Sequence, residues 1–313
     1  MSRSENLLTA LNATAKAVLE RKLSALVGKD DVQAAVPAAR TIWGYSAAYK
    51  LTGDKRALMM ATRAMDHFLE NFLDHKFGGV YSSLNSLDER LDTDKKTDII
   101  AAAIFALSEY ASATGDQDAL RQAENLFEMI ERSMACQGGY VEVKSRDWSE
   151  VEGENPQKLA TLLHVLEGYT NLYKVTRNAK VRACIEALLE VLNQSAASLL
   201  TNYGHWFSLA WQYVYTAMML KDVDLVNKLR NAAHECMRSG FQALEAQTET
   251  PQLWIEGEQM IASFFMWKYN ACDKAADKAI CAWERLQADY PTMQDDLYHT
   301  CRMTYLVNVL LGC

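Results

Sequence analysis

The stretch GYSAAYKLTGDKRALMMATRAMDHFL, residues 44–69, holds the pattern that decides the fold. An apolar segment ends at Thr52, Gly53 and Asp54 follow, and a second segment opens on charged residues. Glycine readily takes the left-handed backbone conformation that ends a helix, and aspartate is a favoured cap for the helix that follows. The stretch therefore predicts a hairpin of two helices.

Copies of this hairpin recur along the chain, and one of them, ALSEYASATGDQDALRQAENLFEMI, repeats the Thr-Gly-Asp turn. Units that repeat in this way cannot bury their apolar faces alone, so they stack or close into a ring. If the two terminal helices pair, they complete a sixth hairpin, and we predict an all-α (α/α)6 barrel, with an open helical solenoid as the alternative. The further copies lie at 106–130, 168–192, 213–237 and 265–286, and the terminal helices at about 5–27 and about 297–311.

The two helices of each hairpin differ in composition. The first is rich in small and aromatic residues on all sides, whereas the second carries charges on one face. A helix that is apolar all round is covered on both sides, and an amphipathic one faces solvent. We therefore expect the first helices to form an inner ring and the second helices an outer ring.

Composition sets the remaining bounds. Half of the 313 residues are apolar, and only 4 prolines and 14 glycines are spread along them, without a linker-like segment. This predicts one mostly helical domain spanning 1–313. The formal net charge of −8 and the scattered basic residues argue against a nucleic-acid partner. No apolar run approaches the roughly 18 residues of a membrane span, and we expect no membrane partner.

The cysteines and motifs point to a cytoplasmic protein without a cofactor. The 7 cysteines form no C-x-x-C pair, which is typical of reduced thiols. The sequence has no Gly-rich phosphate loop and no fixed His and acid spacing of the H-E-x-x-H kind. We therefore expect neither a nucleotide cofactor nor a metal ion. Patches on the outer helices could support a homodimer, so we expect either a monomer or a homodimer.

Polar residues recur at one height in the inner helices. Arg40 and His164 each lie 12 residues before the threonine that ends their helix. Asp98 and His205 lie 16 residues before the corresponding turn, and Glu258 lies 14 before Cys272. At about 1.5 Å per residue these offsets differ by little more than one turn. The residues would form one layer at the N-terminal, positive ends of the inner helices.

His299 opens the last helix and fits the same layer. A ring of arginine, histidines and acids suits a small polar substrate, and nearby aromatic rings could stack on a sugar. Helix starts also attract polar residues as caps. Capping explains Asp98 and Glu256 as well as a substrate site does, but it explains histidine and arginine poorly. The aromatic candidates are Trp43, Tyr45, Trp206, Phe207, Trp254 and Tyr298.

These segments resemble the N-acylglucosamine 2-epimerase superfamily, which includes cellobiose 2-epimerases and mannose isomerases. RTIWGYSAAYKLTGDKRAL is similar to its Arg-x-x-Trp helix, and DHKFGGVYSSLN to its Gly-Gly-hydrophobic-Tyr hairpin. FALSEYASATGD and LHVLEGYTNLYKVT follow the family pattern closely. YGHWFSLAW, WIEGEQM and LYHTCRM resemble its Gly-His, Trp-Pro-Gln-Ala-Glu and Tyr-His-x-x-Arg segments. The family fold is an (α/α)6 barrel.

The resemblance implies roles for individual residues. His164 and His299 fall where the family has its two acid/base histidines, and Arg40 takes the place of an arginine that contacts a substrate oxygen. His205 matches a further active-site histidine, and Glu258 a carboxylate near it. The remaining substrate-binding positions are Trp43, Asp98, Trp206, Ser208, Trp254 and Tyr298.

The chain also departs from the family pattern. Ala160 replaces an asparagine four residues before the first catalytic histidine, and Ser208 replaces a glutamate three residues after His205. Trp206 and Asp98 stand where the family has aspartate and tyrosine. The proton-transfer pair is therefore retained, while part of the polar cradle around the sugar has changed.

The implied reaction removes a proton α to a carbonyl. Once the sugar ring has opened, a neutral imidazole takes the proton from C2 and leaves a cis-enediolate. Returning a proton to the other face of C2 gives the epimer, and returning it to C1 gives the ketose. Histidine suits this step because its usual pKa of about 6.5 lies near working pH. Arg40 would stabilise the developing oxyanion, with His205 and Glu258 opening the ring or orienting the sugar.

Two other functions remain open. Asp98, Glu256 and Glu258 could serve a glycoside hydrolase or lyase on the same toroid, if two carboxyl groups lie roughly 5–10 Å apart across one cleft. Alternatively, the barrel could bind a sugar or a protein without catalysis. His67, His75 and His234 lie in or beside outer helices and are interpreted as surface or structural residues.

Overall fold

The computed structural model describes residues 3–24, 32–153, 157–199, 202–247, 252–270, 273–288 and 296–311. They belong to two compact units. Unit 1 spans residues 1–25, 50–53 and 200–313, and unit 2 spans residues 26–49 and 54–199. The expectation of a single domain over 1–313 stays a prediction.

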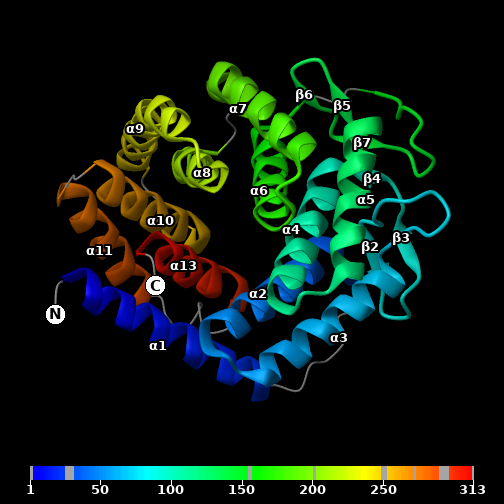
Figure 1. The fold of residues 1–313 in the computed structure, drawn as a ribbon, viewed down its shortest axis with the longest axis horizontal. Helices are drawn as coiled ribbons and strands as arrows, with labels where there is room; N and C mark the ends of the chain where they lie inside the picture. Colours follow the sequence, from blue (N-terminus) through cyan, green and yellow to red (C-terminus); the bar gives the residue numbers. More distant parts are fainter. Residues whose placement is uncertain are drawn as a thin grey trace. The chain divides into compact units, whose positions relative to one another are not determined.

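Within the described residues, unit 2 contains three helical hairpins and the strands that connect them. The strands form three small antiparallel sheets, ordered β1-β2-β3, β4-β7 and β5-β6, and β2 to β7 gather in the connections beside α4 and α5 (Figure 1). The helices are α2 (Ala35–Thr52, whose last residues 50–52 belong to unit 1), α3 (Lys55–Asn71), α4 (Thr97–Thr114), α5 (Gln117–Ser133), α6 (Leu159–Thr176) and α7 (Ala179–Leu199). The strands are β1 (Val32–Ala34), β2 (Ser83–Asn85), β3 (Arg90–Asp92), β4 (Lys95–Lys96), β5 (Ala135–Cys136), β6 (Gly139–Tyr140) and β7 (Val143–Lys144).

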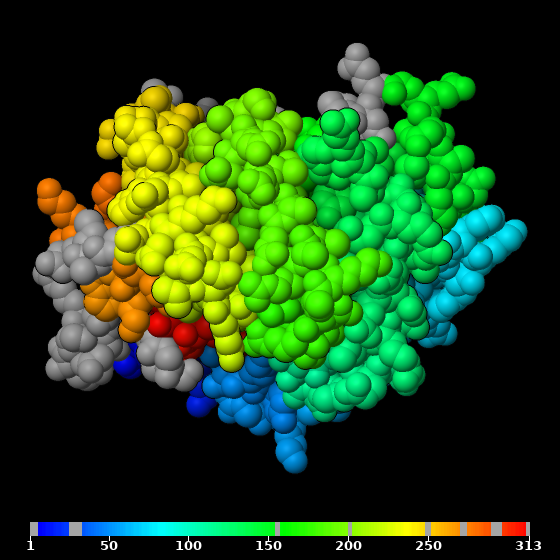
Figure 2. Space-filling view, turned by 45° about the horizontal axis from the view of Figure 1, so that its top comes forward, coloured from blue at the N-terminus to red at the C-terminus, as the bar shows by residue number. Residues whose placement is uncertain are grey.

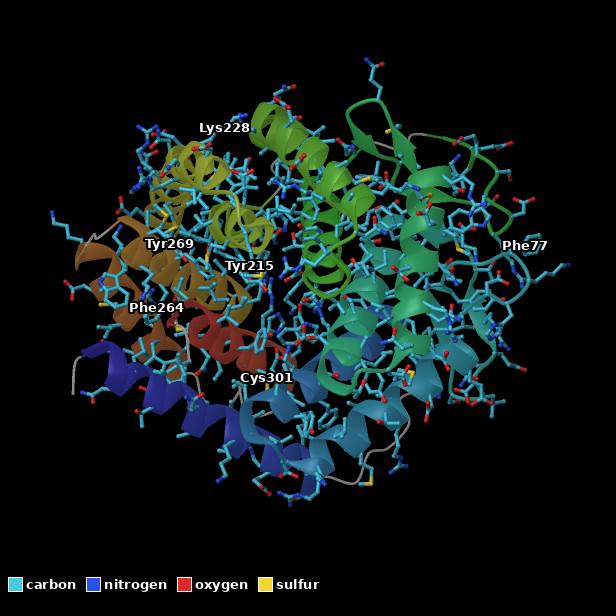
Figure 3. All side chains as sticks on the ribbon, viewed as in Figure 1. Phe77, Tyr215, Lys228, Phe264, Tyr269 and Cys301 are labelled. Atoms are coloured by element: carbon cyan, nitrogen blue, oxygen red, sulfur yellow. The ribbon has the colours of Figure 1, made fainter. Side chains whose placement is uncertain are left out.

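The described residues of unit 1 form helices joined by short turns, with no strand among them. Its core includes Tyr215, Phe264 and Cys301, all of them buried (Figure 3). The helices are α1 (Arg3–Ser24), α8 (Gly204–Leu220), α9 (Val223–Glu245), α10 (Leu253–Asn270), α11 (Asp273–Ala288) and α13 (Leu297–Leu311). The predicted hairpins are confirmed, although the turn of the last one, 271–272, and the end of the first predicted helix, 25–27, lie outside the described residues.

The turns of the hairpins follow the predicted chemistry. Gly53 and Gly115 take left-handed conformations, with φ of 71° and 79°. The carboxylate of Asp54 accepts a hydrogen bond from the backbone N–H of Arg56 at 2.8 Å, and Asp116 caps α5 in the same way. The Thr-Gly-Asp turn therefore ends one helix and begins the next, because the glycine takes the left-handed conformation and the aspartate caps the following helix.

The inner and outer helices differ in burial as expected. In α4 nearly every residue from 97 to 111 is buried, whereas α5 buries only one stripe along its length. The inner helices α4 and α6 pack closely, because a Cβ on Gly168 would lie 2.7 Å from the backbone oxygen of Ala101. The buried faces of α4 and α6 therefore fix the orientation of any residue that they carry.

The terminal helices of the chain pair with each other. In unit 1, α1 and α13 lie side by side (Figure 1). The Asn308 side chain donates a hydrogen bond to Asn12 at 3.0 Å, and the Thr304 hydroxyl donates to the backbone oxygen of Leu11 at 3.3 Å. The prediction that the first and last helices form a further pair is confirmed.

Two surface features of the described residues complete the fold. The β2–β3 hairpin projects from unit 2, cyan in Figure 2, and exposes Leu87 and Leu91. Within the described ranges, every helix is too short or too polar to cross a lipid bilayer.

Candidate functional site

The residues predicted from the sequence lie where the inner helices begin. Each lies within the first turns of its helix, at the end where the positive pole of the helix dipole lies. They are Arg40 and Trp43 on α2, Asp98 on α4, His164 on α6, His205, Trp206 and Ser208 on α8, Trp254 and Glu258 on α10, and Tyr298 and His299 on α13.

In unit 2, His164 occupies the accessible stripe of a buried helix. Its neighbours Leu163 and Val165 are buried, whereas Ala160, His164 and Glu167 are all partly accessible. These three positions follow the i, i+4, i+7 spacing of one helix face. His164 is therefore not a core histidine, and Ala160, which replaces the family's asparagine, lies one turn away on the same face.

The adjacent inner helix carries a matching stripe. Asp98, Ala102 and Phe105 on α4 are partly accessible at the same spacing, between buried residues. The indole of Trp43 stacks on Phe105, with ring centroids 5.2 Å apart and an interplanar angle of 12°. Trp43 is itself 2% exposed. Its indole therefore packs mainly within the core of unit 2, and its role in stacking on a sugar stays a prediction.

Glu142 fixes the start of the helix that carries His164. Its carboxylate accepts a hydrogen bond from the backbone N–H of Lys158 and another from the Thr161 hydroxyl, both at 2.7 Å. Its backbone oxygen accepts from the N–H of Thr97, the first residue of α4, at 3.0 Å. One residue of the β6–β7 connection therefore holds the first turns of both α4 and α6.

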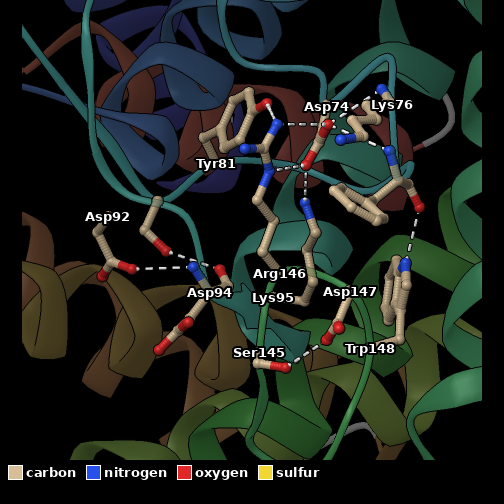
Figure 4. A network of polar contacts seen from close by, with 12 residues as sticks. Asp74, Lys76, Tyr81, Asp92, Asp94, Lys95, Ser145, Arg146, Asp147 and Trp148 are labelled. Atoms are coloured by element: carbon tan, nitrogen blue, oxygen red, sulfur yellow. Dashed lines mark hydrogen bonds and ion pairs between the residues drawn. The ribbon is translucent and has the colours of Figure 1, made fainter.

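A buried ion-pair network joins the connection between α3 and α4 to the connection between α5 and α6 (Figure 4). The Asp74 carboxylate accepts from Lys95 Nζ at 2.9 Å and from Arg146 Nε at 2.8 Å. It also accepts from the backbone N–H groups of Lys76 and Phe77 at 3.0 and 3.2 Å. Burial by itself raises the pKa of Asp74, but the bonds from Arg146, Lys95 and the backbone outweigh it and hold that pKa far below its usual value.

This network lies between segments that are distant in the sequence. Asp74 and Lys95 are fully buried at their side chains, whereas Arg146 is partly exposed and also donates to the Tyr81 hydroxyl at 2.7 Å. The indole of Trp148 closes one side by donating to the backbone oxygen of Phe77 at 2.8 Å. The connections that lead into α4 and α6 are thus joined by charge as well as by strands.

In unit 1, Glu258 is buried and fully engaged. Trp211 Nε1 donates to one of its oxygens at 2.6 Å, and Arg302 pairs with the other. Burial would raise the pKa of Glu258, but the charge of Arg302 and the hydrogen bonds from Trp211 and Ser208 lower it. Glu258 is therefore a stable carboxylate, and Ser208 contacts it directly.

His205 packs against the start of α10. Its ring lies 5.6 Å from that of Trp254, centroid to centroid, at an angle of 39°. The contact depends on Gly204, because a Cβ there would lie 2.6 Å from the Trp254 indole. The Gly-His pair thus brings an imidazole and an indole together, and Trp206, beside them, is partly accessible.

His299 is held by its own helix cap. The carboxylate of Asp296 lies 2.5 Å from His299 Nδ1 and accepts from the backbone N–H of His299 at 2.9 Å. The Tyr298 ring meets the imidazole edge to face at 4.9 Å, and the Arg302 guanidinium lies 5.8 Å from the Tyr298 ring centroid. His299 is partly exposed and is not sealed in the apolar core.

Several of these partners were not among the residues singled out from the sequence. Arg302 lies within the quoted Tyr-His-x-x-Arg segment, so the motif itself could have identified it. Asp296 could have been found as a helix cap before Tyr298. The partnership of Asp74 with Lys95 and Arg146 has no local signal, since the three lie far apart in sequence.

The two predicted acid/base histidines belong to different units, His164 to unit 2 and His299 to unit 1. Their meeting across one pocket stays a prediction. His67, interpreted as structural, hydrogen-bonds Gln33 and Asn71 on and beside the outer helix α3. Among the described residues, no group of three or more His, Cys, Asp and Glu side chains could hold a metal ion.

Comparison with known proteins gives one consistent result. The model of the family N-acylglucosamine 2-epimerase (GlcNAc 2-epimerase) matches residues 20–219. The cellobiose 2-epimerase of Bacteroides fragilis is 32% identical over 288 residues, which cover 79% of this chain and 74% of that protein.

Solved structures agree in fold. The cellobiose 2-epimerase from Spirochaeta thermophila superposes with a TM-score of 0.87 at 19% identity, covering 100% of this chain and 99% of its own. A D-mannose isomerase superposes with a TM-score of 0.80 at 15% identity over 100% of both chains. The fold class is thus the all-α (α/α)6 barrel that the repeat predicts. The chain belongs to the N-acylglucosamine 2-epimerase family.

Proposed function

We propose that this chain, a sugar 2-epimerase or aldose isomerase by its family, moves the C2 proton of a free aldose with histidine side chains. The main support is the position of His164, which lies on the accessible stripe of an otherwise buried inner helix. It is one turn from Ala160, the residue that replaces the family's asparagine. His299, partly exposed at the start of α13, is the proposed second acid/base group.

The proposed reaction runs through a cis-enediolate. After ring opening exposes the C1 aldehyde, one imidazole removes the C2 proton, and the electron pair moves onto the carbonyl oxygen. Arg40 stabilises the resulting oxyanion. One imidazole accepts the C2 proton, and an imidazolium returns a proton to the other face of C2 or to C1. Because imidazoles carry both proton transfers, the proposed cycle needs no cofactor. Positioned acid–base catalysis of this kind contributes about 10²–10⁴-fold to the rate.

Glu258 takes a positioning role in this proposal. Both of its carboxylate oxygens are bound, one by Trp211 and one by Arg302. An ionised, fully bonded carboxylate is a poor proton donor, so Glu258 holds Arg302 and Ser208 in place instead of opening the ring. His205, in contact with Trp254, remains the candidate for ring opening or sugar orientation.

The contacts of Glu256 weigh against a carboxylate-based hydrolase or lyase. Arg285 on the outer helix α11 binds both oxygens of Glu256, each at 2.8 Å. Glu256 therefore faces the outer helix, and Glu258 is engaged as described. A hydrolase needs two carboxyl groups at the substrate. With both glutamates bound by arginines, only Asp98 of the three candidate carboxyl groups remains.

The proposed substrate is an aldose with a free reducing end. The relatives are cellobiose 2-epimerases and a mannose isomerase, and such sugars share the C1 aldehyde and C2 proton that the mechanism needs. We propose further that the protein acts in the cytoplasm, as a monomer or homodimer, without nucleic acid.

Proton exchange at C2 tests the proposal directly. The protein is incubated in deuterated water with mannose, glucose, N-acetylmannosamine or cellobiose, and the C2–H signal is followed by NMR. We expect exchange with at least one sugar, and its loss in His164→Ala and in His299→Ala. His67→Ala on the outer helix α3 is the matched control and should retain exchange. Exchange with none of the sugars, or full exchange in both active-site variants, would refute the proposal.

A further inference from the structure

The contact between Asp296 and His299 uses both oxygens of one carboxylate. Oδ1 accepts from the backbone N–H of His299 at 2.9 Å, which is the usual work of a helix cap. Oδ2 lies 2.5 Å from Nδ1 of the same residue. The carboxylate therefore holds both the start of α13 and the imidazole ring.

An ionised carboxylate can only accept hydrogen bonds. At 2.5 Å the Nδ1 atom of His299 must therefore carry a proton and donate it to Asp296. In the neutral ring this leaves the lone pair on Nε2, because a neutral imidazole has one donor and one acceptor nitrogen. The cap thus selects one of the two tautomers and presents Nε2 as the basic atom.

We propose that Asp296 is a positioning residue that fixes the tautomer and direction of the His299 ring, so that Nε2 is the atom that exchanges a proton with the sugar. The inference rests on the proposed function only for the last step, the encounter of Nε2 with the substrate. The tautomer itself follows from the two contacts of the carboxylate. A negative charge at this distance also stabilises the imidazolium that forms once Nε2 has taken the proton.

The change Asp296→Asn separates this role from simple capping. Asparagine caps helices about as well as aspartate, so its oxygen can keep the bond to the His299 N–H. Its NH₂ group then faces Nδ1 as a donor, which forces Nδ1 to accept and moves the ring proton to Nε2. Asp296→Ser is the matched control, because serine also caps the helix but has no second group to face the ring.

The ring nitrogens report the tautomer without any need for activity. With ¹⁵N-labelled histidine at mildly alkaline pH, where free imidazole is neutral, His299 should show a pyrrole-type Nδ1 and a pyridine-type Nε2. His299→Ala assigns the signals. Asp296→Asn should exchange the two types, while the melting temperature stays close to that of the parent protein. C2 exchange should fall by about 10²-fold or more in Asp296→Asn, as expected when a base is held in the wrong tautomer, and less in Asp296→Ser.

The outcomes separate the two proposals. A pyridine-type Nδ1 in the parent protein, or an unchanged tautomer in Asp296→Asn, overturns the positioning role. If the parent protein exchanges no sugar proton but the tautomer inverts as expected, the positioning of the ring stands and the proposed function fails. Equal exchange rates in the Asp296→Asn variant and the parent protein would also overturn the positioning role, because Asp296 would then act only as the cap of α13.

Discussion

The buried pair of Asp74 and Lys95 allows a prediction with a definite sign. Both side chains are fully buried and joined at 2.9 Å. Asp74→Asn removes the charge that compensates Lys95 in the interior. Breaking a buried ion pair from one side costs about 3–5 kcal/mol, because an uncompensated charge stays behind. We expect Asp74→Asn to lower the free energy of unfolding by that amount.

Removing the other partner, Lys95, should lower the free energy of unfolding by less, for a structural reason. After Lys95→Met, the Asp74 carboxylate still accepts from Arg146 and from the backbone N–H groups of Lys76 and Phe77. The remaining loss is that of a charged hydrogen bond, about 1–3 kcal/mol. The double variant should be more stable than Asp74→Asn alone, because it no longer buries an unpaired ammonium group.

Urea unfolding followed by far-UV circular dichroism measures all three variants. The pH dependence adds a sign. The pKa of Asp74 is lowered in the folded protein, so its contribution is complete above the unfolded carboxyl pKa of about 3.9 and is lost only as pH falls below it. The gap between parent and Asp74→Asn should stay constant near neutral pH and narrow in acid. If Lys95→Met costs as much as Asp74→Asn, or the double variant is the least stable, the reasoning is wrong.

Two further changes test the packing and the engagement of carboxylates. Gly168→Ala should lower the free energy of unfolding by about 1–3 kcal/mol through overpacking, because its Cβ would lie 2.7 Å from the Ala101 backbone oxygen. Urea unfolding measures the change. A more stable variant, as helix propensity alone would give, would contradict this reasoning. Glu256→Gln should leave sugar C2 exchange within about twofold while lowering stability by about 1 kcal/mol or less. The glutamine can still accept a hydrogen bond from Arg285, whose side chain is 45% exposed and stays solvated. A large loss of exchange in Glu256→Gln would restore the carboxylate mechanism.

The candidate site could be predicted in part from the sequence. His164 was found because polar residues recur at one height before the helical turns, and His299 because it opens the last helix and fits the same layer. Both signals are local in the sequence. The burial pattern then distinguishes His164 from a core histidine. Trp43 lies at the same height as the polar residues, but its side chain is 2% exposed and stacks on Phe105. Sequence spacing cannot indicate this burial, because it depends on the packing of α2 against α4.

The sequence by itself determined the hairpins, since helix periodicity, left-handed glycines and aspartate caps act over a few residues and can be recognised in order along the chain. Only the tertiary structure decided that Glu258 is an engaged carboxylate and that Asp74 binds Lys95 and Arg146. Such pairings depend on where distant segments come together in the folded chain. The strength of such pairings depends on burial, which is set by the packing of many residues and cannot be inferred from any one of them.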